Sequence, residues 1–224
     1  MSNHIGKLIV IEGIDGSGKA TQTRILFEKL KASHLDVETI DFPQYTNNFF
    51  GRQVRRYLNG EFGDPTKVNP YLASILYAAD RWESSDKIKQ WLDQGKIVLL
   101  DRYYTSNLIH QGTKFSQDEL EKFISWNEAM EFDTFQIPRP DLILYLHLPA
   151  AMAYDLITKR GQGHDGHDTL EHMQTAETRC QYLAAKLNWQ TIECCDTTGL
   201  LPIEEIANII WHALQPILEK NKIL

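Results

Sequence analysis

Short apolar runs alternate with amphipathic stretches along most of the 224-residue chain. The apolar runs have the length of β-strands, and several are hydrophobic nearly throughout, as are strands covered on both faces of a parallel sheet. The stretches between them repeat apolar residues at helical intervals, which favours helices that bury one face. The expected strands span residues 7–12, 37–42, 96–101, 141–147 and 191–194. This alternation predicts an α/β fold with a central parallel five-stranded sheet.

Local signals mark where several helices begin. Asn69 offers an N-cap before Pro70, and the sequence SQDE from Ser116 resembles a capping box. The expected helices span residues 19 to about 32, 52–58, 70–82 and 84–92, with further helices after Ser116, Pro149, Thr169 and Pro202. Only the glycine- and histidine-rich segment 161–168 lacks a regular pattern, and it is expected to form a mobile surface loop.

Length and charge narrow the classes of protein that this chain can represent. One domain spanning residues 1–224 is expected, because 224 residues can form a single compact core. The chain carries 23 basic and 30 acidic residues, and no basic stripe offsets its net charge of −7. An acidic surface lacks the electrostatic attraction that drives non-specific nucleic-acid binding, so no nucleic-acid partner is expected.

The sequence also bears on the compartment in which the protein works. The first unbroken apolar run covers residues 8–11, which is too short for a secretory signal, and no segment has the length of a membrane helix. The cysteines, Cys180, Cys194 and Cys195, form no disulfide framework and fit a reducing compartment. We therefore expect a cytoplasmic protein with no membrane partner.

A phosphate-binding loop follows the first expected strand. The sequence GIDGSGKAT matches the GxxxxGK pattern and opens an amphipathic helix, which is the context that such a loop requires. Backbone N–H groups of the loop and the helix N-terminus attract phosphates, and Lys19 adds a cation for the β- and γ-phosphates. The alternative, a tight glycine turn, does not account for the lysine. The predicted nucleotide-binding residues are Gly13, Asp15, Gly16, Ser17, Gly18, Lys19, Ala20 and Thr21.

One position in this loop departs from the usual pattern. The residue after the lysine normally has a hydroxyl group that binds Mg²⁺, but here it is Ala20. Thr21 does not replace it directly, because one step along a helix turns a side chain by about 100°. We expect Mg²⁺ to be held by nucleotide phosphates, water and an acid from another strand. Asp101, at the end of the third expected strand, suits a metal-bound water.

Arg102 follows Asp101 at the same edge of the expected sheet. Ligands of open α/β sheets bind at the carboxyl ends of the strands. The guanidinium group matches a phosphoryl group in shape and keeps its charge, so Arg102 suits a phosphate. An Asp–Arg ion pair that caps the strand is the alternative interpretation.

The order of these motifs resembles the thymidylate kinase family. The resemblance covers nearly the whole chain and is carried by IEGIDGSGKAT from Ile11, FPQY from Phe42, LYAADRWE from Leu76, DRYYTSNLIHQG from Asp101 and RGQGHDGHDTLE from Arg160. It implies a three-layer P-loop NTPase fold with a mobile lid at about residues 160–171. It also implies a homodimer that uses ATP and Mg²⁺ to convert dTMP to dTDP, with ADP as the second product.

The resemblance assigns roles to individual residues. It implies that Asp15 contacts the sugar 3′-hydroxyl, Tyr77 stacks on thymine and Arg81 contacts a thymine carbonyl. Asn107 matches a base-contacting position and Arg102 the arginine that holds the acceptor phosphate. Phe42, Tyr45 and Gln111 complete the implied substrate-binding set. Without the resemblance, Tyr77 reads as a core aromatic residue beside Leu72, Ile75 and Leu76.

Several positions depart from the pattern of the family. Gln44 follows Phe42-Pro43, where many relatives carry an arginine that steers the acceptor phosphate. Arg52, Arg55 or Arg56 could supply that charge, or could form a solvated helix face. His110 stands where close relatives often have a tyrosine beside the sugar, which leaves the basis of deoxyribose selection open.

The segment that resembles a lid carries the remaining candidates. Arg160 is the candidate to neutralise charge on the transferred phosphoryl group, which makes Lys19, Arg102 and Arg160 the predicted catalytic residues. His164, Asp165, His167 and Asp168 are ligand types that suit zinc, but contacts of a glycine-rich loop are the favoured interpretation.

Two other functions remain open at this point. Another small P-loop kinase, such as a deoxynucleoside kinase, would need a carboxylate base near the 5′-hydroxyl, and the Phe42-Pro43 stretch supplies none. A nucleotide-binding regulator that has lost turnover would fit Ala20 and the small number of basic residues in the lid segment.

Overall fold

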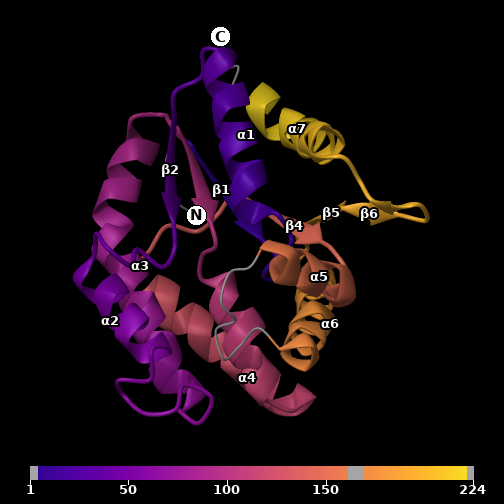
Figure 1. Ribbon diagram of the computed structural model, residues 1–224. Coiled ribbons are helices and arrows are strands. Elements are labelled where there is room, and N and C mark those ends of the chain that lie inside the picture. The colour runs from indigo at the N-terminus through magenta and orange to yellow at the C-terminus, as the bar shows by residue number, and fades with distance from the viewer. Residues whose placement is uncertain (1–4, 161–168, 221–224) are drawn as a thin grey trace.

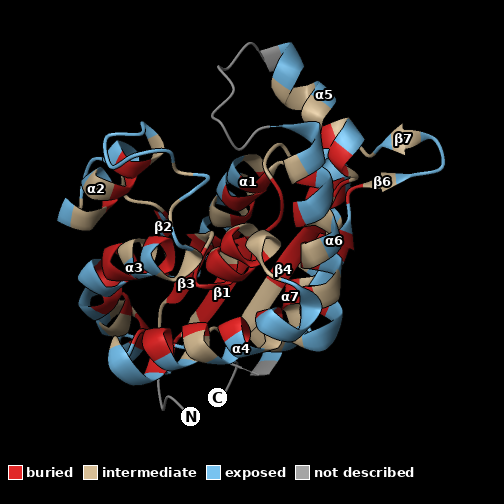
Figure 2. Cartoon of the chain, turned by 90° about the horizontal axis from the view of Figure 1, so that it is seen from below, coloured by how far each residue is buried: buried red, intermediate tan, exposed pale blue. Residues whose placement is uncertain are grey.

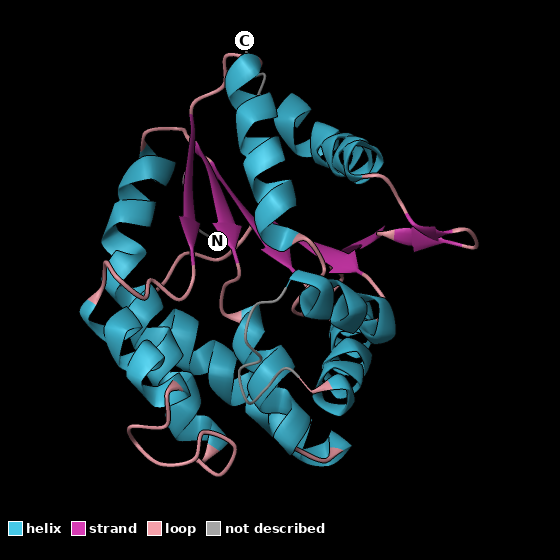
Figure 3. Ribbon diagram, in the orientation of Figure 1, coloured by secondary structure: helices cyan, strands magenta, loops and turns pink. Residues whose placement is uncertain are grey.

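A central sheet of five parallel strands forms the middle layer of the computed structural model, which describes residues 5–160 and 169–220 (Figures 1 and 3). The strands stand in the order β2-β3-β1-β4-β5. Their bounds are β1 Lys7–Glu12, β2 Val37–Asp41, β3 Ile97–Asp101, β4 Leu142–His147 and β5 Gln190–Glu193. Each agrees with its expected strand to within one residue at either end, so the predicted parallel five-stranded sheet is confirmed.

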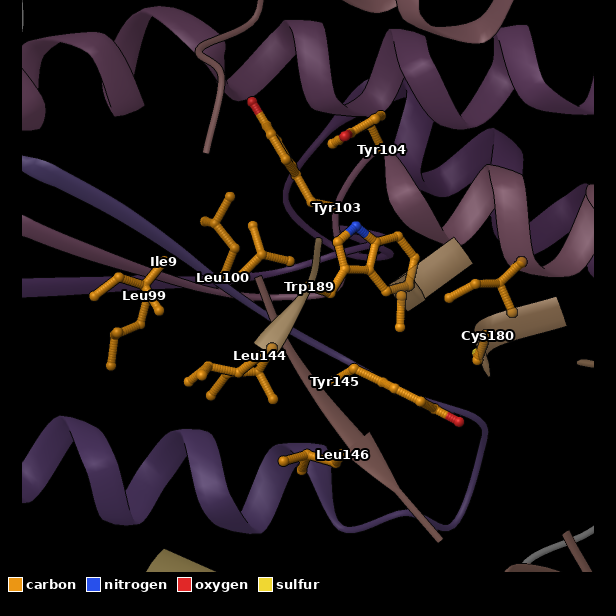
Figure 4. Close-up of a cluster of buried hydrophobic side chains, with 14 of the residues drawn as sticks. Ile9, Leu99, Leu100, Tyr103, Tyr104, Leu144, Tyr145, Leu146, Cys180 and Trp189 are labelled. Carbon is orange, nitrogen blue, oxygen red and sulfur yellow. The ribbon is translucent and has the colours of Figure 1, made fainter. Parts of the chain in front are cut away.

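The sheet is covered by helices on both faces, which explains its apolar strands. Leu8, Ile9, Val10 and Ile11 of β1 are all fully buried, and Figure 2 shows the sheet as the buried interior of the molecule. Ile9, Leu99 and Leu144 come from three adjacent strands and lie in one cluster with Leu100 and Tyr145 (Figure 4). A strand that is buried on both sides has no solvent-exposed face, so polar and apolar residues do not alternate along it.

Seven α-helices surround this sheet within the described residues. Their bounds are α1 Lys19–Ala32, α2 Phe49–Leu58, α3 Pro70–Asp93, α4 Gln117–Glu128, α5 Ala150–Arg160, α6 Leu170–Lys186 and α7 Ile203–Lys220. One layer consists of α1 and α7, which pack on each other and on the sheet, and the other includes α3 and α6 (Figure 1). The three-layer P-loop fold is therefore confirmed.

The start signals of the helices act as the sequence indicates. The Asn69 side chain accepts a hydrogen bond of 2.9 Å from the backbone N–H of Tyr71, and Pro70 opens α3. The backbone N–H of Ser116 donates to the Glu119 carboxylate at 3.0 Å, which forms part of a capping box at the start of α4. These side chains satisfy backbone groups that the first helical turn leaves unpaired.

The expected break between residues 82 and 84 is wrong, because α3 is one continuous helix. The charged residues before that point interrupt the apolar period, but they are not on a solvated surface. Asp80 and Arg81 are buried and each has hydrogen-bond partners on another element. Ser84 is also buried and accepts a hydrogen bond of 2.8 Å from the Asn48 side chain. Buried polar contacts thus accompany a continuous helix where a break was expected.

Four further features of the fold are not indicated by the sequence pattern. Residues Asn107–Gln111 and Ala129–Thr134 form the π-helices η1 and η3, and Gly112–Lys114 forms the 3₁₀-helix η2. After β5 the chain forms a hairpin of β6 Cys195–Asp196 and β7 Gly199–Leu200, which projects from the body of the molecule (Figure 2).

No helix among the described residues is long and apolar enough to cross a membrane.

Candidate active site

The phosphate-binding loop connects β1 to α1 at the carboxyl edge of the sheet. Gly16 and Gly18 have φ values of +78° and +90°, which glycine adopts without strain. A Cβ atom at Gly16 would lie 2.7 Å from the carbonyl oxygen of Ala153, so the close approach of α5 also requires glycine. The loop lines a cavity of about 210 Å³ whose walls are Asp15, Gly16, Gly18, Lys19, Ala20, Thr21, Asp101 and Arg102. The cavity unites most of the predicted nucleotide-binding residues with the acid and arginine that follow β3.

Lys19 is buried inside this loop. Its ammonium group donates to the carbonyl oxygens of Gly13 at 2.9 Å and Ile14 at 2.8 Å. Burial and the charge of Arg102 lower the pKa of Lys19, while Asp15 and Asp101 oppose that shift. An ammonium group has three N–H donors, so the loop leaves one for a phosphate oxygen without breaking either contact.

Arg102 joins the phosphate-binding loop to the segment after β3. Its guanidinium group forms an ion pair with Asp15 through Nη2, and its Nη1 lies 3.1 Å from Nε2 of His110. Burial by itself would raise the pKa of Asp15, but Arg102 and then Lys19 hold that pKa well below its ordinary value. The acid that pairs with Arg102 is therefore Asp15 of the phosphate-binding loop, and not the adjacent Asp101 of the alternative interpretation.

The backbone of Arg102 is itself unusual. Its φ is +68°, a left-handed conformation that few residues other than glycine adopt. The backbone N–H donates to the carbonyl oxygen of Ile11 at 3.0 Å, and the next N–H, that of Tyr103, donates to the Glu12 carboxylate at 3.1 Å. These bonds to β1 on both sides of the turn hold the conformation in place.

Glu12 is a buried carboxylate that the sequence analysis did not single out. Its Oε1 atom accepts hydrogen bonds from the backbone of Tyr103 and from the hydroxyl groups of Thr105 at 2.7 Å and Ser106 at 2.9 Å. The side chain is fully buried. An acid that directly follows four apolar residues at the end of a strand is the signal that could have identified it. Through Glu12 the start of the phosphate-binding loop is fixed to the segment that carries Arg102.

The predicted base-binding residues lie on α3 and η1. Tyr77 is partly buried and meets Tyr57 edge-on, with their ring centroids 6.2 Å apart. Asn107 is buried, and its amide nitrogen donates to the Ser74 carbonyl at 3.2 Å and to the Asn127 side chain at 3.1 Å. Gln111 is buried as well, and its Oε1 has no hydrogen-bond partner within the described part of the chain.

Arg81 is held by an acid that the sequence analysis missed. The guanidinium group is 2% exposed and its Nε donates to both carboxylate oxygens of Glu131, at 3.1 and 3.2 Å, while Nη2 also contacts Oε1. Glu131 is fully buried in η3, and its Oε1 accepts from Asn107 at 3.3 Å. Nothing near Glu131 in the sequence indicates this role, because its partner lies 50 residues away. The pair fixes Arg81 and leaves its Nη1 atom for another acceptor.

The segment after β2 is anchored to α3. Asp80 accepts hydrogen bonds of 2.9 Å from the backbone N–H of Gln44 and from the side chain of Asn48. Phe42 is buried and packs on Tyr103 at 6.1 Å between ring centroids, so it lies in the core. A direct contact of Phe42 with substrate stays a prediction.

The side chains of the three arginines of α2 contact different groups. Arg55 lies over the ring of Tyr45, 5.2 Å from its centroid. Arg52 donates to the Thr46 carbonyl at 3.3 Å, and Arg56 pairs with Glu61 at 2.7 Å. Arg55 is therefore the one of the three that contacts a predicted substrate-binding residue.

Asp101 is the acid on the cavity wall that could hold a metal ion, because the other acid there, Asp15, is paired with Arg102. It pairs in register with Asp41 of β2, and burial raises its pKa. Within the residues that the structure describes, no group of three or more His, Cys, Asp and Glu side chains could hold a metal ion. One carboxylate beside the cavity fits Mg²⁺, which commonly keeps several waters and takes phosphate oxygens as ligands. Ala20 lines the same cavity, and its methyl side chain offers no oxygen ligand.

The lid segment falls largely outside the described residues. Its residues 161–168, including His164, Asp165, His167 and Asp168, are not described, and neither is the side chain of Arg160. The predicted role of Arg160 therefore stays a prediction. Thr169 is described, and its hydroxyl accepts a hydrogen bond of 3.2 Å from the backbone of His172 at the start of α6.

A family model for thymidylate kinase matches residues 11–205 of this chain. The chain belongs to the thymidylate kinase family. A human thymidylate kinase is 32% identical over 227 residues, which cover 98% of this chain and 97% of the human one. A thymidylate kinase from Desulfotalea psychrophila is 35% identical over 180 residues, or 80% of this chain and 82% of that protein.

A solved structure extends the likeness to thymidylate kinases to three dimensions. The thymidylate kinase of Candida albicans superposes with a TM-score of 0.74 at 25% sequence identity, covering 99% of this chain and 95% of that one. Its published title refers to broad substrate specificity and a novel structural element, both of which are properties of that protein. The match over nearly the whole chain does not favour a deoxynucleoside kinase or a nucleotide-binding regulator without turnover.

Proposed function

We propose that this chain transfers the γ-phosphoryl group of ATP to dTMP, producing ADP and dTDP. Membership of the thymidylate kinase family supports the substrates. The observation that carries the proposal is the position of Arg102, which contacts the phosphate-binding loop through Asp15 and helix η1 through His110. A cation at that point can meet the phosphates of both nucleotides.

On the donor side, the chain binds a triphosphate through backbone N–H groups and a buried ammonium group. The loop and the N-terminus of α1 supply the N–H groups, and Lys19 lies within the loop that cradles the β- and γ-phosphates. Mg²⁺, when bound near Asp101, would neutralise part of the charge on the transferred group. The attacking oxygen belongs to a phosphate, so no side chain has to remove a proton from it.

Arg102 acts where the two anionic nucleotides would repel each other most. Its guanidinium group keeps its positive charge because Asp15, Glu12 and Asp101 raise its pKa against the effect of burial. Two N–H groups are engaged by Asp15 and His110, and a guanidinium group has five donors. The remaining donors are free to bind phosphoryl oxygens. Arg160 is proposed as a second cation for the transferred group.

On the acceptor side, the buried polar groups suit a pyrimidine with an imide edge. Thymine presents two carbonyl oxygens and one N–H, and can stack on an aromatic ring. Arg81 is oriented by Glu131 with one nitrogen remaining, and Gln111 carries a buried acceptor oxygen. We infer that Arg81 donates to a thymine carbonyl, Gln111 accepts from the imide N–H and Tyr77 stacks on the ring. Asp15 would accept from the sugar 3′-hydroxyl.

A second copy of this chain is the proposed partner. Leu72, Ile75 and Trp82 lie on one face of α3 and are 64%, 41% and 49% exposed, and Phe49 at the start of α2 is 54% exposed. The backbone N–H of Phe49 donates to Glu83 of α3, so the two helices present one surface. Large exposed apolar patches mark interaction sites. We also propose a cytoplasmic location, because all three cysteines are free.

An ADP-release assay with a panel of acceptors tests the proposed reaction. The panel contains thymidine, dTMP, dUMP, dCMP and dAMP, each with ATP and Mg²⁺. We expect release to be fastest with dTMP, and the Lys19→Ala variant serves as the inactive control. Release with thymidine instead of dTMP would indicate a deoxynucleoside kinase. ATP binding without acceptor-dependent release would indicate a regulator.

A further inference from the structure

His110 contacts the guanidinium group of Arg102 through a ring nitrogen that must act as an acceptor. Nη1 of Arg102 lies 3.1 Å from Nε2 of His110. A guanidinium nitrogen only donates hydrogen bonds, so Nε2 carries no proton in this contact. The ring proton of the neutral imidazole is therefore on Nδ1.

The surroundings keep this imidazole neutral. Burial, followed by the charge of Arg102, lowers the pKa of His110 to about 3. His172 and Lys19 act in the same direction, and Asp15 opposes them. His110 thus offers a neutral acceptor to Arg102 at physiological pH, whereas a protonated ring would repel the guanidinium group and lose the acceptor.

Two elements fix the orientation of the ring. His110 belongs to the π-helix η1, whose backbone also carries Asn107 and Gln111. On its other side the ring stacks on His172 of α6, with centroids 6.1 Å apart and planes 18° from parallel. The acceptor atom is consequently held in place before any ligand arrives, which is what a group that orients another side chain requires.

The contact also limits how Arg102 can pair with Asp15. Arginine and a carboxylate often form two parallel hydrogen bonds, and in the end-on arrangement these engage both terminal nitrogens. Here Asp15 contacts Nη2, while Nη1 faces His110. A guanidinium group captured in both bonds by Asp15 would turn its most accessible donors away from the phosphates.

We propose that His110 is a positioning residue for phosphoryl transfer, whose Nε2 orients Arg102 towards the acceptor phosphate and prevents its end-on capture by both oxygens of Asp15. The proposal rests on the proposed function, because it takes Arg102 to bind that phosphate. His110 itself forms no bond to the reacting atoms in this account. Its effect is transmitted through one hydrogen bond, so it should depend on Arg102.

Three substitutions at residue 110 distinguish the contribution of the hydrogen-bond acceptor from that of the aromatic ring. His110→Phe keeps an aromatic ring against His172 and removes the acceptor. His110→Gln places an amide oxygen near the position of Nε2, and His110→Asn, the matched control, places it near Nδ1. We expect His110→Phe to lower kcat/KM for dTMP by about tenfold or more, because a hydrogen bond to a charged group is lost. The KM for ATP should not change.

The glutamine variant should recover kcat/KM for dTMP to within about threefold of the unsubstituted enzyme, and the asparagine variant should resemble the phenylalanine variant. Equal kcat/KM values for the unsubstituted enzyme and His110→Phe would overturn the proposal. Equal recovery by glutamine and asparagine would also overturn it, because a general polar or structural role would then suffice. If His110→Phe does not fold, the kcat/KM values of His110→Gln and His110→Asn for dTMP test the proposal by themselves.

A double-mutant cycle tests whether His110 acts through Arg102. In an Arg102→Ala background, His110→Phe should change kcat/KM for dTMP by less than about twofold, because the group that His110 orients is gone. Independent, multiplicative losses would overturn the proposal. An unsubstituted enzyme that does not phosphorylate dTMP would contradict the proposed function. An active enzyme whose kcat/KM for dTMP does not change when His110 is substituted would contradict only this inference.

Discussion

Arg102 combines a rare backbone conformation with contacts to two separate parts of the site. The left-handed turn at this residue, with φ of +68°, ends β3 and brings the side chain to Asp15 of the phosphate-binding loop. A strained backbone conformation of this kind persists only where the surrounding structure holds it in place. Here the carbonyl of Ile11 and the carboxylate of Glu12 accept hydrogen bonds from the N–H groups of Arg102 and Tyr103. The residue is thus fixed by the same strand that begins the phosphate-binding loop.

The shape of the guanidinium group should matter more than its charge. Lysine at position 102 would keep a positive charge but could not contact Asp15, His110 and a phosphate in one plane. We expect Arg102→Lys to lower kcat/KM for dTMP by about 100-fold and the affinity for ATP much less. Steady-state kinetics and ATP binding measured by calorimetry would test this. A lysine variant with nearly full activity would show that charge alone suffices.

Glu12 should matter for folding stability. Its Oε1 accepts three hydrogen bonds in a buried position, and an amide at the same place would offer a weaker acceptor and an unwanted donor. We expect Glu12→Gln to lower the free energy of unfolding by about 2 kcal/mol or more. Urea unfolding measures this, with the exposed Glu204→Gln as the control. Equal stability of Glu12→Gln and the unsubstituted enzyme would contradict the role assigned to Glu12.

At the scale of elements, helix η1 organises the acceptor side. Its π-helical turn carries Asn107, His110 and Gln111 within five residues. Asn107 reaches Glu131 of the second π-helix, η3, and Glu131 in turn orients Arg81 of α3. Short π-helical segments are frequent at functional sites. Here two of them meet through one buried carboxylate, which connects three elements of the predicted base-binding site.

A second group of contacts joins elements at the β4–β5 edge of the sheet. His147 at the end of β4 contacts Glu193 of β5 at 2.6 Å and Glu177 of α6 at 3.2 Å. Glu177 also accepts a hydrogen bond of 2.8 Å from Ala150 at the start of α5. One imidazole thus connects the ends of two strands to the middle of α6, and through Glu177 to the start of α5.

This histidine predicts a pH dependence of stability. Burial alone would lower the pKa of His147, but the hydrogen bonds that its ring donates to Glu193 and Glu177 raise it above its ordinary value of 6.5. A raised folded-state pKa stabilises the fold fully below pH 6.5, and the contribution is lost as the pH rises through the folded-state value. The unfolding free energy should therefore fall with rising pH in the unsubstituted enzyme relative to His147→Gln. Parallel pH profiles of the two proteins in urea unfolding would contradict this.

Elements defined by local signals could be predicted from the sequence, and those defined by distant partners could not. Helix α1 begins at Lys19 and ends at Ala32 as expected, because the phosphate-binding loop and a regular apolar period define it. The continuity of α3 was missed because the partners of Asp80 and Arg81, on other elements, make its charged stretch a buried one. The same reason hid Glu131. The contact of Arg102 with Asp15 joins residues 87 positions apart, and no local pattern announces it.

At the scale of the whole molecule, the exposed apolar face of α3 predicts self-association. Leu72 and Trp82 lie on this face, and Trp82 packs only partly on Phe135, with ring centroids 6.3 Å apart. Burying such residues in a second copy removes apolar surface from water. The face is separate from the cavity at the phosphate-binding loop, so association would leave that cavity open.

Sedimentation equilibrium tests the proposed dimer. We expect the unsubstituted chain to be dimeric at micromolar concentration and Trp82→Glu to be monomeric, because a buried unpaired charge opposes association. Leu200→Glu on the β7 hairpin is the matched control, since Leu200 is also about half exposed, at 47%, but lies away from α3. A monomeric unsubstituted chain would contradict the proposal, as would dissociation of the control to the same extent.

The central claim is that two nucleotides bind end to end across Arg102. A crystal structure of the enzyme with dTMP and a non-hydrolysable ATP analogue tests it most directly. We predict the triphosphate in the loop around Lys19, the thymine ring between Tyr77 and Arg81, and the dTMP phosphate within hydrogen-bond distance of Arg102. A pyrimidine ring bound elsewhere, or an acceptor phosphate that does not contact Arg102, would contradict the account.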